Sequence, residues 1–480
     1  MARTLSDVHL DIDLGTESQP VAVRSPDEPF RMVLLGDFGG RAHRNEPRLR
    51  RDPILIDPDN FEEVMQRLGA GLALSAGGVD LSLRFRELDD FHPDRLYETL
   101  PIFQSLRRAR AELSDPATFR AAAAGLQRDP QPPADPPTPF AGSLLDQIVE
   151  QSSETGPPPL ERGAALDDAI RRIVAPHIIP KPDAHQQELL AQLDAATSAL
   201  MRAILHDPHF QELEAAWRSI FFLLQRVETT VERKLYLIDI TREEMLEATR
   251  SGLPQLIARE GWSAAACLHS FQPSEEDCKA LTVLAGLARK SGGPLLAGMH
   301  PRLMGCESIA ATPDPDDWKQ PLDEVSMLAW RQLRAHPDAC WLGLAMPRIL
   351  LRLPYGRDTS EAETFEFEEM PHPPDHEAYL WGSPAVACLC LLGQGFAARG
   401  WQMHPGLGNR LDGMPVHNYR VDGELRMTPA AETWLTDRVA EKVLAQGVMP
   451  LVSSKNTDSV LLMRSQSIAD PVRPLAGHWD

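Results

Sequence analysis

Long apolar runs are missing from this sequence, and basic residues are scarce. No run of 18 or more apolar residues occurs, which predicts that no helix spans a membrane. Lys and Arg number 48 against 69 Asp and Glu, so the formal net charge is −21. A surface of this sign repels nucleic-acid phosphates and anionic lipids, and the small Arg clusters at 48–51 and 107–110 are too few to reverse it. We therefore expect neither nucleic-acid binding nor membrane insertion.

Paired cysteines are absent as well. The six cysteines are spread over positions 267–390 without a CxxC pair, a pattern typical of reduced and mostly buried thiols. Residues 1–15 contain early acids and no apolar core, so they do not resemble a secretory signal. These two observations together predict a cytoplasmic protein.

Prolines mark where the 480 residues divide. Residues 128–140 contain six prolines in thirteen positions, which excludes a helix or a strand ladder there. We predict a small strand–helix domain over residues 1–127 and a proline-rich linker with one short amphipathic helix over 128–182. A larger domain then covers residues 183–480.

The first segment alternates strand and helix signals. The run FRMVLL at 30–35 predicts a strand buried on both faces, and the glycines of GDFGG at 36–40 end it in a turn. Asp59 and Glu62 have the spacing of a capping box at the start of a helix. The other expected elements are a strand over 79–85 and a helix that begins at Pro93 and is kinked at Pro101.

The third segment begins with two helical patterns separated by Asp207-Pro208, which favours an αα-hairpin. Buried strands and helices then alternate with short connections, which implies a right-handed parallel crossover. The expected strands are 234–240, 264–269 and 294–299, and the expected helices start at Thr241 and Ser274 or cover 323–334, 378–399 and 429–446. The fold class is therefore α/β (α+β) with a partly parallel sheet.

Patterns for catalysis or metal binding are not found. GDFGG at 36–40 lacks the Gly-Lys-Ser/Thr ending of a phosphate loop, and no Gly-x-Ser-x-Gly elbow occurs. His206 and His209 flank a helix break, and His372 and His376 lie in a proline-rich loop without metal-ligand spacing. We therefore predict a protein that is not an enzyme and has no catalytic residue, cofactor or metal site.

Eight longer stretches resemble the contractile-sheath proteins of type VI secretion, which consist of a small subunit (TssB or VipA) and a large subunit (TssC or VipB). Three stretches of the first segment are similar to the small subunit: PFRMVLLGDFGGR at 29–41, RDPILIDPDNFEEVM at 51–65 and LSLRFRELDDFHPDRL at 81–96. Five of the third segment are similar to the large subunit: HDPHFQELEAAWRSIFFLL at 206–224, WLGLAMPRILLRLPYGRDT at 341–359, FEFEE at 365–369, YLWGSPAVAC at 379–388 and GMPVHNY at 413–419.

The resemblance implies both subunits in one chain, with the large subunit lacking its usual C-terminal portion after MRSQS at 463–467. It also implies a structural subunit of the contractile sheath of a type VI-like secretion system, which assembles by subunit packing and strand exchange around an inner tube. The implied partners are copies of itself, separate sheath subunits, the inner tube protein, the baseplate and the AAA+ ATPase ClpV. The second hypothesis is a non-polymerising accessory or regulatory relative that binds sheath, baseplate or the ATPase.

The resemblance also suggests where partners bind. SLLDQIVEQ at 143–151 looks like the start of the large subunit, where the family's ATPase docks, so Leu144, Leu145 and Ile148 are candidate docking residues. The alternating residues 9–14 are a candidate strand for exchange between subunits. Large amphipathic or bidentate side chains in the family-like stretches are candidate interface residues, although each could equally form a contact inside the domain: Trp217, Arg218, Arg348, Arg352 and Tyr355.

Overall fold

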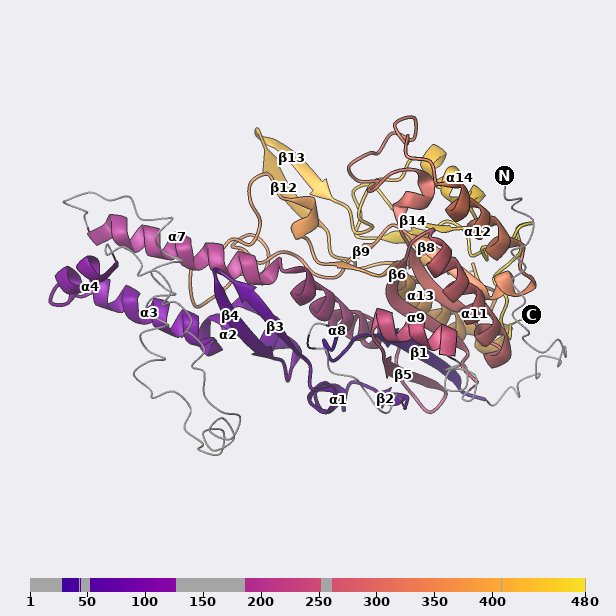
Figure 1. Cartoon of the computed structure of the whole chain (residues 1–480), viewed down its shortest axis with the longest axis horizontal. Helices are drawn as coiled ribbons and strands as arrows, with labels where there is room; N and C mark the ends of the chain where they lie inside the picture. Colours follow the sequence, from indigo (N-terminus) through magenta and orange to yellow (C-terminus); the bar gives the residue numbers. More distant parts are fainter. Residues whose placement is uncertain are drawn as a thin grey trace, which may run out of the picture.

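A mixed sheet of nine strands runs through the molecule and is built from both ends of the described sequence (Figure 1). The computed structural model describes residues 28–42, 44, 52–126, 186–251, 261–406 and 408–479. The strand order is β11-β15-β14-β8-β7-β6-β1-β5-β2. Strands β14, β8, β7, β6, β1 and β5 pair in parallel, and the antiparallel strands lie at the two ends.

The strands of this sheet come from residues far apart in the sequence. They are β1 (Phe30–Gly36), β2 (Ile54–Ile56), β5 (Arg233–Asp239), β6 (Ala264–Phe271), β7 (Leu295–Met299), β8 (Leu342–Met346), β11 (Arg410–Leu411), β14 (Met449–Ser453) and β15 (Val460–Leu462). Three small antiparallel pairs accompany it: β3 (Gly71–Ala76) with β4 (Val79–Arg84), β9 (Ile349–Leu350) with β10 (Trp381–Gly382), and β12 (His417–Val421) with β13 (Glu424–Thr428).

Helices cover both faces of the large sheet and form two hydrophobic cores. One face carries α8 (Pro208–Arg226) and α13 (Pro384–Arg399), and the other carries α9 (Arg242–Ser251), α11 (Glu275–Ser291), α12 (Glu324–Ala335) and α14 (Asp437–Ala445). The remaining helices are α1 (Phe61–Leu68), α2 (Pro93–Thr99), α3 (Pro101–Ser114), α4 (Phe119–Leu126) and α7 (Gln186–Leu205). Short 3₁₀ turns cover Leu88–Phe91, Pro301–Met304, Pro337–Trp341, His376–Ala378 and Gly400–Gln402.

Strand β1 is central because its alternate side chains enter both cores. Met32 and Leu34 belong to the core beneath α8 and α13, while Val33 and Leu35 belong to the core beneath α11. A strand covered on both faces needs apolar side chains at nearly every position, and FRMVLL provides them. The first segment therefore contributes to the sheet of the third segment, between β5 and β6, which the sequence did not predict.

A long helical arm extends from the sheet (Figure 1). Its helices α3 and α7 come from the first and third segments, and Arg110 of α3 forms an ion pair with Asp194 of α7 at 2.7 Å. At the start of α7, Gln186 donates from Nε2 to the carbonyl oxygens of Leu113 and Ser114 at 2.6 and 2.9 Å. The two segments thus touch along the arm as well as in the sheet.

Most of the expected elements are confirmed. Strands β1, β4, β5, β6 and β7 lie where the apolar runs and, for β4, the alternation of polar and apolar residues predict them. The capping box of α9 forms, since Thr241 and Glu244 exchange hydrogen bonds between side chain and amide. Helix α11 is capped by Ser274 and ends at Gly292, whose φ is +81°. Strands β6 and β7, which α11 connects, pair in parallel as predicted.

Three local expectations are wrong. Helices α7 and α8 follow each other lengthwise, so the hairpin does not form; α7 packs on α3 instead (Figure 1). Asn60, not Asp59, precedes α1, and the carboxylate of Asp57 accepts the nearby amides of Asp59 and Asn60. The stretches expected to be helical over 378–399 and 429–446 become helix only at Pro384 and Asp437, since a strand and loops occupy their first residues.

Some expectations concern residues outside the described ranges. These are the strand at 9–14, the linker over 128–182 and its helix at 143–151, which contains Leu144, Leu145 and Ile148. Among the helices that are described, none is both long and apolar enough to cross a membrane.

We predict that Gly40→Ala destabilises the protein far more than Gly78→Ala. Both glycines have positive φ, +68° and +74°, which costs an alanine about 1–2 kcal/mol. A methyl group on Gly40 would also overlap the backbone carbonyl of Gly71, whereas one on Gly78 meets no atom within 4 Å. Urea unfolding of both variants checks this; equal losses of stability would contradict the close packing of the turn.

Candidate site joining the two segments

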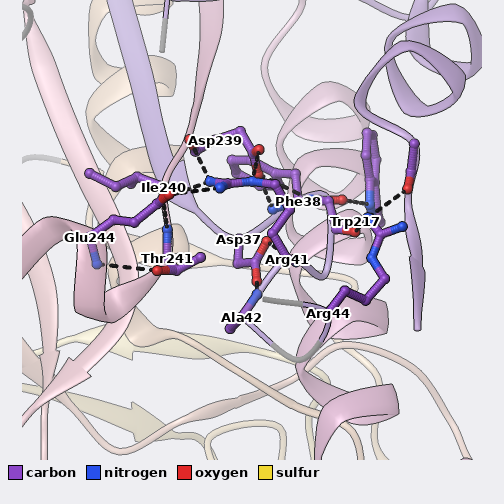
Figure 2. Close-up of polar contacts among 12 residues, drawn as sticks. Asp37, Phe38, Arg41, Ala42, Arg44, Trp217, Asp239, Ile240, Thr241 and Glu244 are labelled. Carbon is purple, nitrogen blue, oxygen red and sulfur yellow. Dashed lines mark hydrogen bonds and ion pairs between the residues drawn. The ribbon is translucent and has the colours of Figure 1, made fainter. Parts of the chain in front are cut away.

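The turn that follows β1 is fixed to the third segment by a buried cation (Figure 2). Arg41 donates from Nε to Asp239 Oδ2 at 2.7 Å, and its two terminal nitrogens donate to the two carboxylate oxygens of Glu244 at 2.8 and 2.7 Å. Its side chain is 6% exposed. Burial opposes the charge, but the hydrogen bonds and charges of these two carboxylates raise the pKa of Arg41 above its ordinary value. A fixed, permanently charged contact results.

Asp239 also organises the backbone of this turn. Its Oδ1 accepts the amides of Phe38 and Gly39 at 2.8 and 3.1 Å. Asp37 turns the chain a second time, because its carboxylate accepts the amides of Arg41 and Ala42. The carboxylate at the end of β5 therefore holds both the amides and the guanidinium of the GDFGGR stretch, as Figure 2 shows.

Trp217 of α8 is one of the predicted interface residues, and it lies completely buried against the first segment. Its Nε1 donates to the carbonyl oxygen of Phe38 at 2.9 Å (Figure 2). Its ring makes edge contacts with the rings of Phe38 and Phe61, with centroids 6.0 and 5.5 Å apart. Aromatic pairs of this kind stabilise a protein beyond the burial of their apolar surface. Trp217 therefore joins the two segments by apolar contacts and one hydrogen bond.

Three other predicted residues, Arg218, Arg352 and Tyr355, meet in a second buried network. Arg352 bridges two carboxylates: Nε donates to Glu214 at 2.8 Å, and Nη1 donates to Glu369 at 2.8 Å. Arg218 donates to Glu214 at 2.6 Å and to the Tyr355 hydroxyl at 3.0 Å. Two cations thus face two anions, and the guanidinium of Arg352 lies 4.2 Å from the centre of the Tyr355 ring.

The charges of this network stabilise one another inside the protein. Burial would raise the pKa of Glu369, but the nearby charge of Arg352 and its hydrogen bonds lower it to about 2. Burial raises the pKa of Tyr355 to about 12, so its hydroxyl stays protonated. Removing one partner of such a group leaves an uncompensated buried charge.

The first segment reaches this second network as well. The ring of His92 packs edge-on against the ring of Tyr355, and the two ring centres are 4.7 Å apart. Two residues later, Asp94 accepts the amides of Glu363 and Thr364 at 3.0 Å each. The start of α2 therefore holds the loop that carries Glu369, and both buried networks lie where the two segments meet.

Arg348, the fifth predicted interface residue, is not part of these networks. It donates to Glu432 at 2.6 Å and to Glu377 at 3.2 Å, and its side chain is 40% exposed. One possible metal-ligand atom from each of His376, Glu377 and Glu432 lies within 4.8 Å of the other two, which is close enough to bind one metal ion. Because Arg348 already neutralises both carboxylates, this cluster is arranged as an ion-pair network.

The sequence predicts four residues of the two networks but not the most connected ones. The size and chemistry of Trp217, Arg218, Arg352 and Tyr355 mark them as contact residues, whereas GDFGG at 36–40 predicts only a turn that ends a strand. Neither Asp239 nor Arg41 is among the predicted residues. The available signal was a carboxylate that ends a buried strand in each segment, Asp37 after β1 and Asp239 in β5, because a buried charge needs a partner.

Comparison with known proteins identifies both segments. Residues 187–256 and 260–469 match the family described as VipB: EvpB/VC_A0108, tail sheath N-terminal domain. Residues 8–124 match the family described as Type VI secretion system, VipA, VC_A0107 or Hcp2. The VipB match covers more than half of the chain.

This chain belongs to the VipB tail sheath family. A curated relative, the type VI secretion system sheath protein TssC1 of Pseudomonas aeruginosa, is 28% identical over 360 residues, which cover 69% of this chain and 71% of that protein. The VipA match precedes the VipB match, so the resemblance to a TssB–TssC fusion is confirmed. In this sheath-family protein, the network around Arg41 joins VipA-like to VipB-like residues, whereas the network around Arg352 consists of VipB-like residues that His92 of the VipA-like part contacts.

We predict that Trp217→Phe lowers the free energy of unfolding by about 1–3 kcal/mol, because the buried carbonyl of Phe38 loses its donor. Trp318→Phe is the matched control, since it removes a similar bond to the Thr312 carbonyl at a half-buried position within the third segment. Denaturant unfolding followed by fluorescence measures both. A larger loss for the control would show that the Phe38 contact contributes little.

We predict that Glu369→Gln destabilises the protein by about 3 kcal/mol at neutral pH. The pKa of Glu369 is lowered from 4.5 to about 2, so its stabilisation is complete above pH 4.5 and is lost as the pH falls towards 2. The difference between wild type and variant should therefore shrink over this interval. The neighbouring, exposed Glu368 provides the control Glu368→Gln. A difference that stays constant with pH would contradict the assignment.

Proposed function

We propose that this protein is a structural, non-enzymatic subunit of the contractile sheath of a type VI-like secretion system and that it packs with copies of itself around an inner tube. The carrying observation is the position of β1: a strand of the VipA-like residues lies inside the sheet of the VipB-like residues. One chain thereby supplies both parts of a sheath unit at a fixed ratio of one to one.

Exposed apolar side chains support packing against further subunits. Leu55 and Val231 line a groove of about 660 Å³ beside β2 and β5, and they are 43% and 84% exposed. Charged and polar side chains, among them Asp57, Arg226 and Lys234, also line it. Exposed apolar side chains with a polar surround are characteristic of protein–protein contacts.

The five predicted interface residues divide into two roles in this proposal. Trp217, Arg218, Arg352 and Tyr355 hold the shape of the unit from within. Arg348 is the member with an accessible guanidinium, and the exposed Glu377 beside it completes a polar surface suited to a neighbouring subunit.

The remaining partners follow from the sheath role. We propose contacts with the inner tube protein and the baseplate, and docking of the ATPase ClpV on the stretch with Leu144, Leu145 and Ile148. The protein would act in the cytoplasm. Strand exchange at residues 9–14 belongs to the same proposal.

A non-polymerising accessory role is the second candidate, and the ends of the large sheet favour it. The outermost strands β2 and β11 have three and two residues. The carbonyl oxygen of Leu55, in β2, accepts a hydrogen bond from Asn60 Nδ2 at 3.3 Å. Short and covered edges resist strand addition, so this sheet offers little for strand exchange in the described part of the chain.

Sedimentation and negative-stain microscopy of the purified full chain test the main proposal. We expect long helical polymers, and we expect the double variant Leu55→Asp, Val231→Asp to block them without changing the melting temperature. Val472→Asp, at a valine that is 52% exposed outside the groove, is the control.

Monomers at every concentration, also with tube protein added, would contradict polymerisation. Binding of such monomers to sheaths of a separate two-chain system would then support the accessory role.

A further inference from the structure

We propose that this chain excludes separate small sheath subunits because its own first segment permanently fills their binding position. We call this position the seat; it consists of β5 and β6 together with Trp217, Asp239 and Glu244 of the third segment. The proposal rests on the sheath role and makes it more specific, since complete copies of this chain become the sheath subunits that can join.

The strand edges of the seat are fully used. Strand β1 pairs with β5 from Phe30↔Arg233 to Gly36↔Asp239, and it pairs with β6 from Met32↔Ala264 to Leu35↔Cys267. It therefore has a hydrogen-bonded neighbour on each side. A strand from another molecule can pair with β5 and β6 here after β1 has left, and leaving exposes five apolar side chains in two cores.

The polar groups of the seat are used as well. Both carboxylate oxygens of Asp239 accept hydrogen bonds from the first segment, and both of Glu244 accept them from Arg41. The indole of Trp217 donates to Phe38. A competing segment must replace every one of these contacts, since an unpaired buried carboxylate is costly.

The covalent connection gives the resident segment a further advantage. Helix α4 packs on α3, and α7 begins at the end of α3 through the bonds of Gln186. The last described residue before this gap, Leu126, and the first one after it, Gln186, therefore both belong to helices of the same arm (Figure 1). A tethered partner reaches effective concentrations near 1 mM, about 10³-fold above a free partner at 1 μM.

An exchange experiment with the full chain tests this inference. A protease site is inserted within residues 131–139 of a chain that carries an affinity tag on its N-terminus, and the chain is cut after purification. The two pieces should stay together through gel filtration. This cut complex is mixed with an equal amount of uncut, untagged chain, and the tag is captured after one day. We expect less than about 1% of the uncut chain in the captured fraction.

Two uncut variants serve as acceptors that calibrate the result. Phe38→Ala with Arg41→Ala removes resident contacts of the seat, so we expect it to take up the tagged segment at least tenfold more than wild type. Arg95→Ala, at an exposed arginine of the first segment, is the matched control and should behave as wild type.

Stoichiometric capture of uncut wild-type chain would overturn the proposal. A concentration-dependent dimer of the uncut chain that separates into two half-sized complexes after cutting would also overturn it. In that case the first segment of a second copy would fill the seat. Polymer formation is recorded separately. If polymers form and the segments exchange, the filled seat is refuted and the sheath role is not. If no polymers form and the segments do not exchange, the sheath role is refuted and the filled seat is not.

Discussion

A strand that is paired on both sides and covered on both faces cannot be removed from a sheet without loss of the whole core. β1 is such a strand, and it precedes its two neighbours in the sheet, β5 and β6, by about two hundred positions in the sequence. Its position also sets where the turn that follows it meets the third segment. The turn after β1 brings Arg41 to Asp239 and Glu244, and it brings Phe38 to Trp217.

The buried ion pairs give this junction its geometry more than its stability. Arg41 and Arg352 each bridge two carboxylates, and the desolvation of such groups cancels much of their attraction. Apolar contacts such as those of Trp217 with Phe38 and Phe61 provide the larger driving force. The carboxylates, however, accept a guanidinium in few orientations, so Asp239 and Glu244 fix how Arg41 and the VipA-like residues around it sit on the VipB-like residues.

Local structure could be predicted from the sequence where a short pattern determines it. The apolar run of β1, the capping box of Thr241 and Glu244, and the glycine that ends α11 are of this kind. Strand order could not be predicted, because parallel pairing of residues near 30 with residues near 233 and 264 leaves no local pattern. Likewise, the size of Trp217 marks it as a contact residue, but no local pattern in the sequence indicates which residues it contacts.

The arm formed by α3 and α7 affects which insertions such a chain can accept during evolution. Because Gln186 already holds the start of α7 beside Leu113, the intervening stretch need not set any distance or angle. For flexible loops in general, doubling the length costs only about 0.6 kcal/mol of closure entropy. Insertions would therefore be tolerated there, and the gene could acquire new binding modules at that place while the folded unit stayed intact.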